Sequence, residues 1–260
     1  MGLDIYAGTL TRYYSHDWKT AVQQWAEKNG FKCEMVRPGG GAEDEEVMSK
    51  DEIRGAVEAW RDGLLGALER GGAPCEPWSE DDEKPYFTDK PDWDAYNALM
   101  LFEACTLLHR PLPEAFPRRA AYRDVIALND EEEEKLRGLE IAGGVEWWLP
   151  IEEPFSFTGW LPTEDEKTIS TAGALLSELE QLNEATWNAD EEEILRWKDT
   201  EGAPAEVVIS DDGKLVSTGE EIPDTYDPAA AESLAKFAFS IFYQAAKFSL
   251  KNRVPVLLDY

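Results

Sequence analysis

The sequence predicts an α+β fold, in which one compact mixed domain is rich in helices and carries a small sheet with strands from both ends of the chain. Strand-like patterns occupy residues 3–8 and 254–258, and long stretches between them repeat apolar residues at helical spacing. Strands and helices do not alternate regularly, as they would in a doubly wound sheet. The 260 residues, 43% of them hydrophobic, suffice for a core without disulfides. We expect a single domain over 1–260, with 140–145 as the place for any subdivision.

The first third of the chain predicts a strand, a helix and a second strand. Residues 3–8 alternate apolar and polar side chains, which is typical of a half-buried strand. Apolar residues at helical spacing then predict a helix from Asp17 to Asn29, and a glycine follows it. Residues 31–36 read as a short strand that leads into a loop rich in glycine and acid.

Two long helices are expected next. Ser49 and Glu52 have the spacing of a capping box, and the helix that follows them should end at Gly71. Residues 73–91 read as a long connection that aromatic side chains pack onto the domain. Pro91 is placed to open a second helix with a wide apolar stripe, which ends near His109.

The middle of the chain predicts short helices, a strand and a further helix. Residues 118–138 favour one or two short helices, and 145–151 favour a strand. Residues 152–167 are rich in proline, phenylalanine and acid, so we expect a connection there. Apolar residues at helical spacing from Ile169 to Leu182 predict an amphipathic helix.

The last quarter predicts a hairpin, a central helix and a closing strand. Residues 205–209 and 214–217 flank an Asp-Gly turn signal. Asp227 followed by proline is typical of a helix start, and apolar residues cover most of the girth of the helix to Lys251. Residues 254–258 should form a strand that pairs with the N-terminal one.

Composition narrows the classes of partner. The formal net charge is −29, with the acidic residues concentrated in the middle of the chain. Such a field repels nucleic acid and anionic membranes, and it favours a basic protein partner or plain solubility. We expect a cytoplasmic protein, because the sequence shows neither a basic leader nor a long apolar run. The three cysteines are scattered, so we expect no disulfide, no zinc site and no other cofactor.

Catalytic motifs are sparse. The chain has two histidines, no G-x-S-x-G elbow and no glycine-rich phosphate loop. His109 at a helix end has a structural explanation, because the helix dipole favours a cation there. His16 beside Asp17, together with Asp4, could supply a general base or a metal ligand. These three residues are the nominees for a carboxylate- or metal-dependent hydrolase, and no metal site is otherwise indicated.

Tryptophan is the unusual feature, with ten residues in the chain. Trp147, Trp148 and Trp160 lie near Glu152 and Glu153 in the acidic part of the sequence. Neighbours in a strand point to opposite faces, so we expect one of Trp147 and Trp148 in the core and the other outward or under the following loop. Exposed tryptophans among carboxylates suit a cationic protein surface, and a platform for stacking sugars is the other use.

The opening residues 1–14, MGLDIYAGTLTRYY, and the stretch 90–96, KPDWDAY, resemble a group of uncharacterised bacterial proteins, and this resemblance implies no activity. The acid-rich and tryptophan-rich composition is similar to that of bacterial immunity proteins, which neutralise toxin domains by binding them. We therefore interpret the chain as a non-enzymatic, acidic protein-binding module. A hydrolase and a DNA mimic are the alternatives, although broad apolar helices favour a thicker body than a DNA mimic needs.

Overall fold

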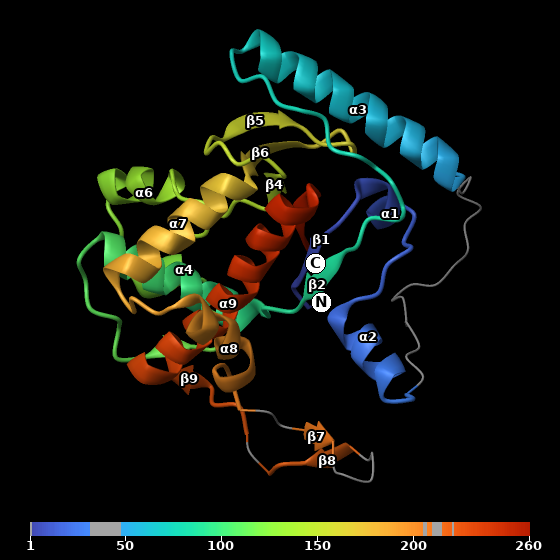
Figure 1. The fold of residues 1–260 in the computed structure, drawn as a ribbon. Helices are drawn as coiled ribbons and strands as arrows, with labels where there is room; N and C mark the ends of the chain where they lie inside the picture. The colour runs from blue at the N-terminus through green and yellow to red at the C-terminus, as the bar shows by residue number, and fades with distance from the viewer. Residues whose placement is uncertain (1, 32–47, 205–206, 210–214, 220) are drawn as a thin grey trace.

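A six-stranded mixed sheet lies at the centre of the computed structural model, which describes residues 2–31, 48–204, 207–209, 215–219 and 221–260 (Figure 1). The strand order is β2-β1-β10-β4-β6-β5. β4 and β6 run parallel, and the other neighbours in this sheet are antiparallel. The strands are β1 (Asp4–Ala7), β2 (Phe87–Asp89), β4 (Trp147–Leu149), β5 (Phe157–Trp160), β6 (Glu166–Thr171) and β10 (Val256–Asp259).

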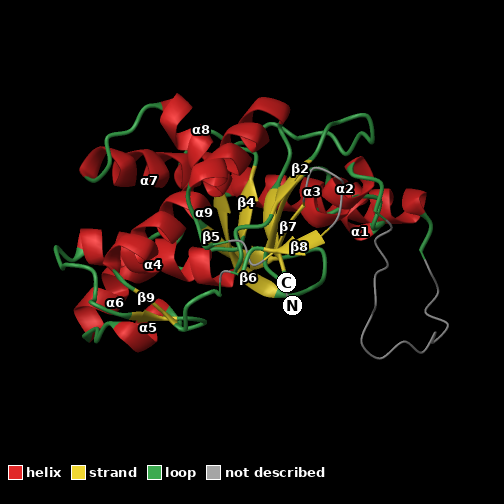
Figure 2. Ribbon diagram, turned by 90° about the horizontal axis from the view of Figure 1, so that it is seen from below, coloured by secondary structure: helices red, strands yellow, loops and turns green. Residues whose placement is uncertain are grey.

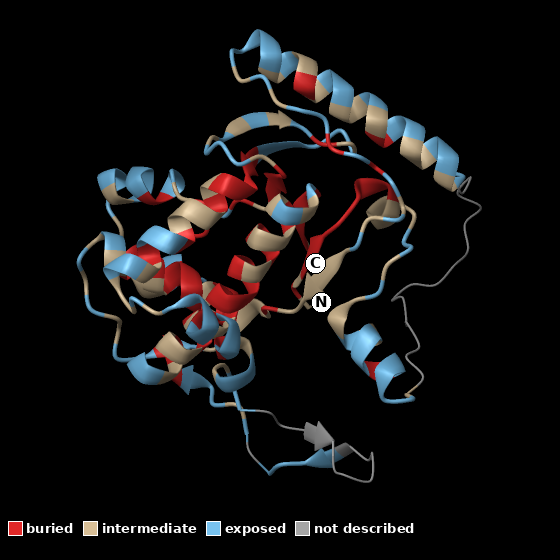
Figure 3. Cartoon of the chain, viewed as in Figure 1, coloured by how far each residue is buried: buried red, intermediate tan, exposed pale blue. Residues whose placement is uncertain are grey.

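Both terminal strands belong to this sheet, as the sequence predicts. β1 pairs with β10 over its whole length, and Asp4 lies opposite Asp259. The side chains of both strands are almost entirely buried, because helices cover both faces of the sheet (Figures 2 and 3). The predicted α+β fold with N- and C-terminal strands in the main sheet is confirmed.

The larger core lies on the face covered by α4 (Trp93–Leu107), α7 (Ala172–Ala185) and α9 (Pro228–Asn252). α9 begins as predicted, because the Asp227 side chain accepts a hydrogen bond from the Ala230 N–H and proline opens the first turn. It is apolar around most of its girth and packs against both α4 and α8 (Glu191–Thr200).

A smaller core lies on the opposite face, under α1 (Leu10–Tyr14) and α3 (Lys50–Arg70). The predicted capping box is present, with Ser49 and Glu52 each accepting a hydrogen bond from the other's backbone N–H. Only Val57 and Leu65 of α3 are buried, so most of this helix is at least partly exposed (Figure 3).

The remaining elements are short and flank these two layers. They are α2 (Ala21–Lys28), α5 (Tyr122–Val125), α6 (Asp130–Arg137), the pair β3 (Phe116–Pro117) and β9 (Thr225–Tyr226), and the pair β7 (Val207–Ile209) and β8 (Leu215–Ser217). The hairpin strands β7 and β8 pair as predicted, while their Asp-Gly turn lies outside the described residues. The predicted strand at 31–36 also lies outside them, apart from Phe31.

Two expectations for the middle of the chain are wrong. Residues 152–167 are not only a connection, because they contain β5 and the start of β6. Ile169 therefore belongs to a strand, and the predicted helix begins only at Ala172. Ile169 is buried in the core under α3, on the face of the sheet opposite α7. Its helical spacing from the later leucines therefore does not reflect a shared helix.

Candidate functional site

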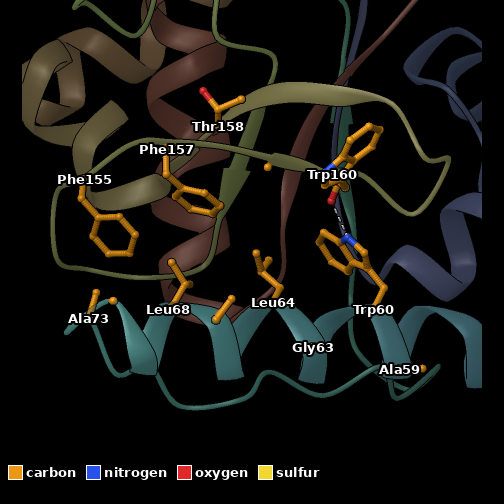
Figure 4. A pocket seen from close by; sticks show the side chains of 13 residues that line it. Ala59, Trp60, Gly63, Leu64, Leu68, Ala73, Phe155, Phe157, Thr158 and Trp160 are labelled. Carbon is orange, nitrogen blue, oxygen red and sulfur yellow. Dashed lines mark hydrogen bonds between the residues drawn. The ribbon is translucent and has the colours of Figure 1, made fainter.

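An apolar groove of about 690 Å³ runs between α3 and the edge strand β5 (Figure 4). One wall is the face of α3 that carries Trp60, Leu64 and Leu68, and the other is the segment from Phe155 to Trp160. Large side chains from both walls line it: Trp60, Leu64, Leu68, Phe155 and Phe157. Trp160 borders one end of it, and its ring lies on the side of β5 that faces away from α3. Below, this feature is called the groove.

The sequence builds each wall from its own periodicity. Trp60, Leu64 and Leu68 recur every four residues and therefore lie on one side of α3. In β5 the alternation of a strand leaves Phe157 half-buried on the side of α3 and Thr158 exposed on the other. The Trp60 Nε1–H donates to the Trp160 carbonyl oxygen at 2.7 Å, which fixes one end of the groove.

Trp160 is the exposed tryptophan of the predicted binding set, with 61% of its surface accessible. Trp147 and Trp148 are both buried, because each face of the sheet at β4 is covered. Trp147 packs edge-on against Trp60, with ring centroids 6.4 Å apart, and so supports the groove from beneath. The expected outward position of one of these two residues is therefore corrected: neither ring is available to a partner.

Glu152 and Glu153, the other predicted binding residues, lie in an adjoining hollow of about 620 Å³ that shares Ala73 and Phe155 with the groove. Both residues are exposed. Within the described part of the chain, neither carboxylate makes a hydrogen bond or an ion pair, whereas nearby Glu76 is paired with Arg253 at 3.0 Å. We call Glu152 and Glu153 the acidic rim of the groove.

The catalytic nominees do not form a constellation among the described residues. Asp4 starts β1 and faces Asp89, Lys90 and Asp259, and burial raises its pKa. His16 follows α1 and is exposed, and Asp17 is committed to Lys50 at 2.6 Å. No hydrogen bond or ion pair joins Asp4 to either, and the described chain holds no cluster of three potential metal ligands.

Three glutamates that the sequence analysis did not single out meet around the turn at residues 139–145. Glu178 accepts the backbone N–H groups of Glu140 and Ile141 at 2.6 and 2.8 Å. Glu103 accepts the Ala142 N–H and shares a hydrogen bond with Glu178. Burial, and then the neighbouring Glu178 carboxylate, raise the pKa of Glu103 well above its usual range, so Glu103 is the protonated partner.

Their positions show no spacing pattern, since they lie on α4, at the turn and on α7. One signal was present in the sequence: Glu103 interrupts an otherwise apolar stretch from Ala98 to Cys105, and a charged residue there must find a polar partner. The glutamates serve the backbone of the turn, and none of them lines the groove or the adjoining hollow.

Glu140 gives this cluster a measurable pH dependence. Burial raises its pKa to about 7, although Trp148 Nε1 and Ser170 Oγ donate to it at 2.7 Å each. A carboxyl whose pKa is raised on folding stabilises the fold fully below its unfolded pKa, near 4.5, and loses that contribution as the pH rises through about 7. The free energy of unfolding should fall by up to about 3 kcal/mol on this account.

Glu140→Gln should remove that fall. The amide oxygen can still accept from Trp148, and the amide N–H can donate to Ser170 Oγ, whose hydroxyl also lies 3.1 Å from the Phe155 carbonyl oxygen. Urea unfolding between pH 5 and pH 8 should show a flatter profile than the native protein. A profile with unchanged slope would exclude Glu140 as the titrating group.

Comparison of the chain with protein-family models, curated proteins and solved structures gives no match. No helix among the described residues is both long and apolar enough to span a membrane. The groove and its acidic rim therefore have to be interpreted from their own chemistry.

Proposed function

We propose that this protein is an acidic protein-binding module, similar in action to an immunity protein, and that the groove with its acidic rim holds a segment of a basic protein partner. The observation that carries the proposal is the exposure of Trp160 beside an open apolar groove. The Trp160 ring is exposed on one side of the edge strand β5, and the groove with its five large apolar side chains lies on the other side. Both sides of this strand therefore offer apolar surface of the kind that marks a binding site.

The chemistry of the partner follows from the charges around the groove. Glu152 and Glu153 leave two uncompensated carboxylates at one end, and Glu164 and Glu166 are exposed beyond Trp160 at the other. Arg253, the cation that lines the hollow with the acidic rim, is paired with Glu76. A partner segment with apolar side chains flanked by lysine or arginine would satisfy both parts of this surface.

Trp160→Ala should weaken such binding at least tenfold, because it removes the exposed aromatic side chain of the edge strand that borders the groove. The test captures proteins from lysate of the source organism on the native chain, purifies what is retained and measures its affinity for each variant. Trp25→Ala is the matched control, since Trp25 is 43% exposed on α2 and does not line the groove. Equal affinities of both variants for the retained protein would contradict the proposal.

The electrostatic part is tested by a second pair of variants. Glu152→Gln with Glu153→Gln should weaken binding and reduce its salt dependence. Glu180→Gln with Glu184→Gln on the exposed side of α7 changes the net charge by the same amount away from the groove. If the two double variants lose the same affinity, only the overall charge matters and the acidic rim has no specific role.

A further inference from the structure

Resting on the proposed function, we propose that the partner segment binds as an added β-strand along the outer edge of β5. β5 is the last strand of the sheet, paired on one side with β6. Backbone hydrogen bonds along the free edge would provide affinity, and alternate side chains would enter the groove.

The register of the β5–β6 pair shows which backbone groups face outward. Phe157 lies opposite Ile169 and Gly159 opposite Lys167 in an antiparallel ladder. The Leu161 N–H donates to the Asp165 carbonyl at 2.8 Å, and this pair continues the same register. Hydrogen-bonded and non-hydrogen-bonded pairs alternate in such ladders, so Phe157, Gly159 and Leu161 bond to β6. Thr158 and Trp160 then direct their N–H and C=O groups away from β6.

The position of Trp60 supports this assignment. Its Nε1–H donates to the outward carbonyl oxygen of Trp160, so the outer edge of β5 faces the groove and α3 (Figure 4). Among the described residues, the N–H and C=O of Thr158 and the N–H of Trp160 have no partner on that side. These three groups can form hydrogen bonds with a short added strand. That strand must end at Trp160, because the Trp160 carbonyl oxygen already accepts a hydrogen bond from Trp60.

A cationic strand fits this position best. A strand added beside β5 would place every second side chain next to Phe157, above Leu64 and Leu68, where apolar residues fit. Its other side chains and its ends would meet solvent, the acidic rim and Glu166, where lysine or arginine fits. Pairing of two copies of this chain is opposed by the formal charge of −29 on each.

The direct test is amide hydrogen exchange measured by NMR with a synthetic peptide of alternating lysine and valine, blocked at both ends. The Thr158 and Trp160 amides should exchange quickly in the free protein and at least tenfold more slowly with saturating peptide. The Gly159 amide, already bonded to β6, is the internal control and should change little. The same peptide with alternate backbone nitrogens methylated should not bind. No saturable binding, or binding without this protection, would overturn the inference.

Thr158→Pro removes the outward N–H at a position where an edge strand tolerates proline, and Thr158→Val retains it. Peptide affinity should fall at least tenfold for the proline variant and less than twofold for valine. Should the proline variant fail to fold, the exchange measurement on the unaltered protein decides the matter. This inference and the proposed function fail on different results. A retained protein whose affinity falls with Trp160→Ala but not with Thr158→Pro supports the binding module and excludes strand addition, whereas equal affinities of Trp160→Ala and Trp25→Ala contradict the binding module itself.

Discussion

Glu178→Gln should destabilise the protein by about 2–3 kcal/mol, whereas Glu103→Gln should change its stability by less than about 1 kcal/mol at pH 7. The two side chains share a hydrogen bond, but they accept different numbers of backbone N–H groups. Both oxygens of Glu178 accept backbone N–H groups, from Glu140 and Ile141. A glutamine has one acceptor oxygen, so its amide group would face an N–H that it cannot satisfy.

Glu103 is already protonated and resembles an amide in its hydrogen bonding. In Glu103→Gln, the oxygen can accept from the Ala142 N–H and the amide N–H can donate to Glu178. Urea unfolding of both variants and of the native protein at pH 7 measures the contrast. Equal destabilisation by the two substitutions would show that the proton is not held by Glu103, and a reversed order would place it on Glu178.

Gly173→Ala should cost about 3 kcal/mol and disturb the acidic rim. Gly173 lies in the first turn of α7, and an added Cβ would sit 1.8 Å from the Glu152 carbonyl oxygen. The backbone there is fixed twice, by the Gly173 N–H donating to the Ile151 carbonyl at 3.0 Å and by Thr171 Oγ1 donating to the Glu153 carbonyl. The clash therefore displaces backbone, which is harder to move than a flexible side chain.

Gly55→Ala is the control, because it should raise the free energy of unfolding instead of lowering it. Gly55 lies in α3, and nothing within 4 Å would meet its added Cβ. Alanine should stabilise the helix there by about 0.5–1 kcal/mol. Thermal unfolding of both variants measures the difference, and the partner affinity of Gly173→Ala should fall because Glu152 and Glu153 move. If Gly173→Ala is as stable as the native protein, the segment at 151–153 is not held as closely as described.

The architecture followed from local patterns, because long amphipathic helices and apolar terminal strands are encoded in consecutive residues. The capping box at Ser49, the proline start of α9 and the strand pattern at each end of the chain are of this kind. β5 was not foreseen, since it is four residues long and lies in a stretch whose prolines and acids indicate a loop. Its strand character comes from pairing with β6.

The candidate site was predicted only in part, for the same reason. Trp160 lies at one end of the groove, and Glu152 and Glu153 lie in the hollow that adjoins the other end, but the α3 wall comes from about a hundred residues earlier in the chain. A single sequence carries no signal for that distant contact. Trp147 and Trp148 illustrate the converse: alternation correctly separates them onto two faces, but it cannot tell that both faces are covered.

The strand order has a consequence for how the chain assembles. β10 lies between β1 and β4, although it follows both of them by more than a hundred residues along the chain. A nascent chain that has not yet reached residue 256 therefore contains β1 and β4 but not the strand between them. The backbone groups on the edges of β1 and β4 that later pair with β10 are then unpaired. Such long-range closure slows folding and leaves apolar edges exposed during synthesis. The two parts of this sheet can therefore join only after β10 has been synthesised.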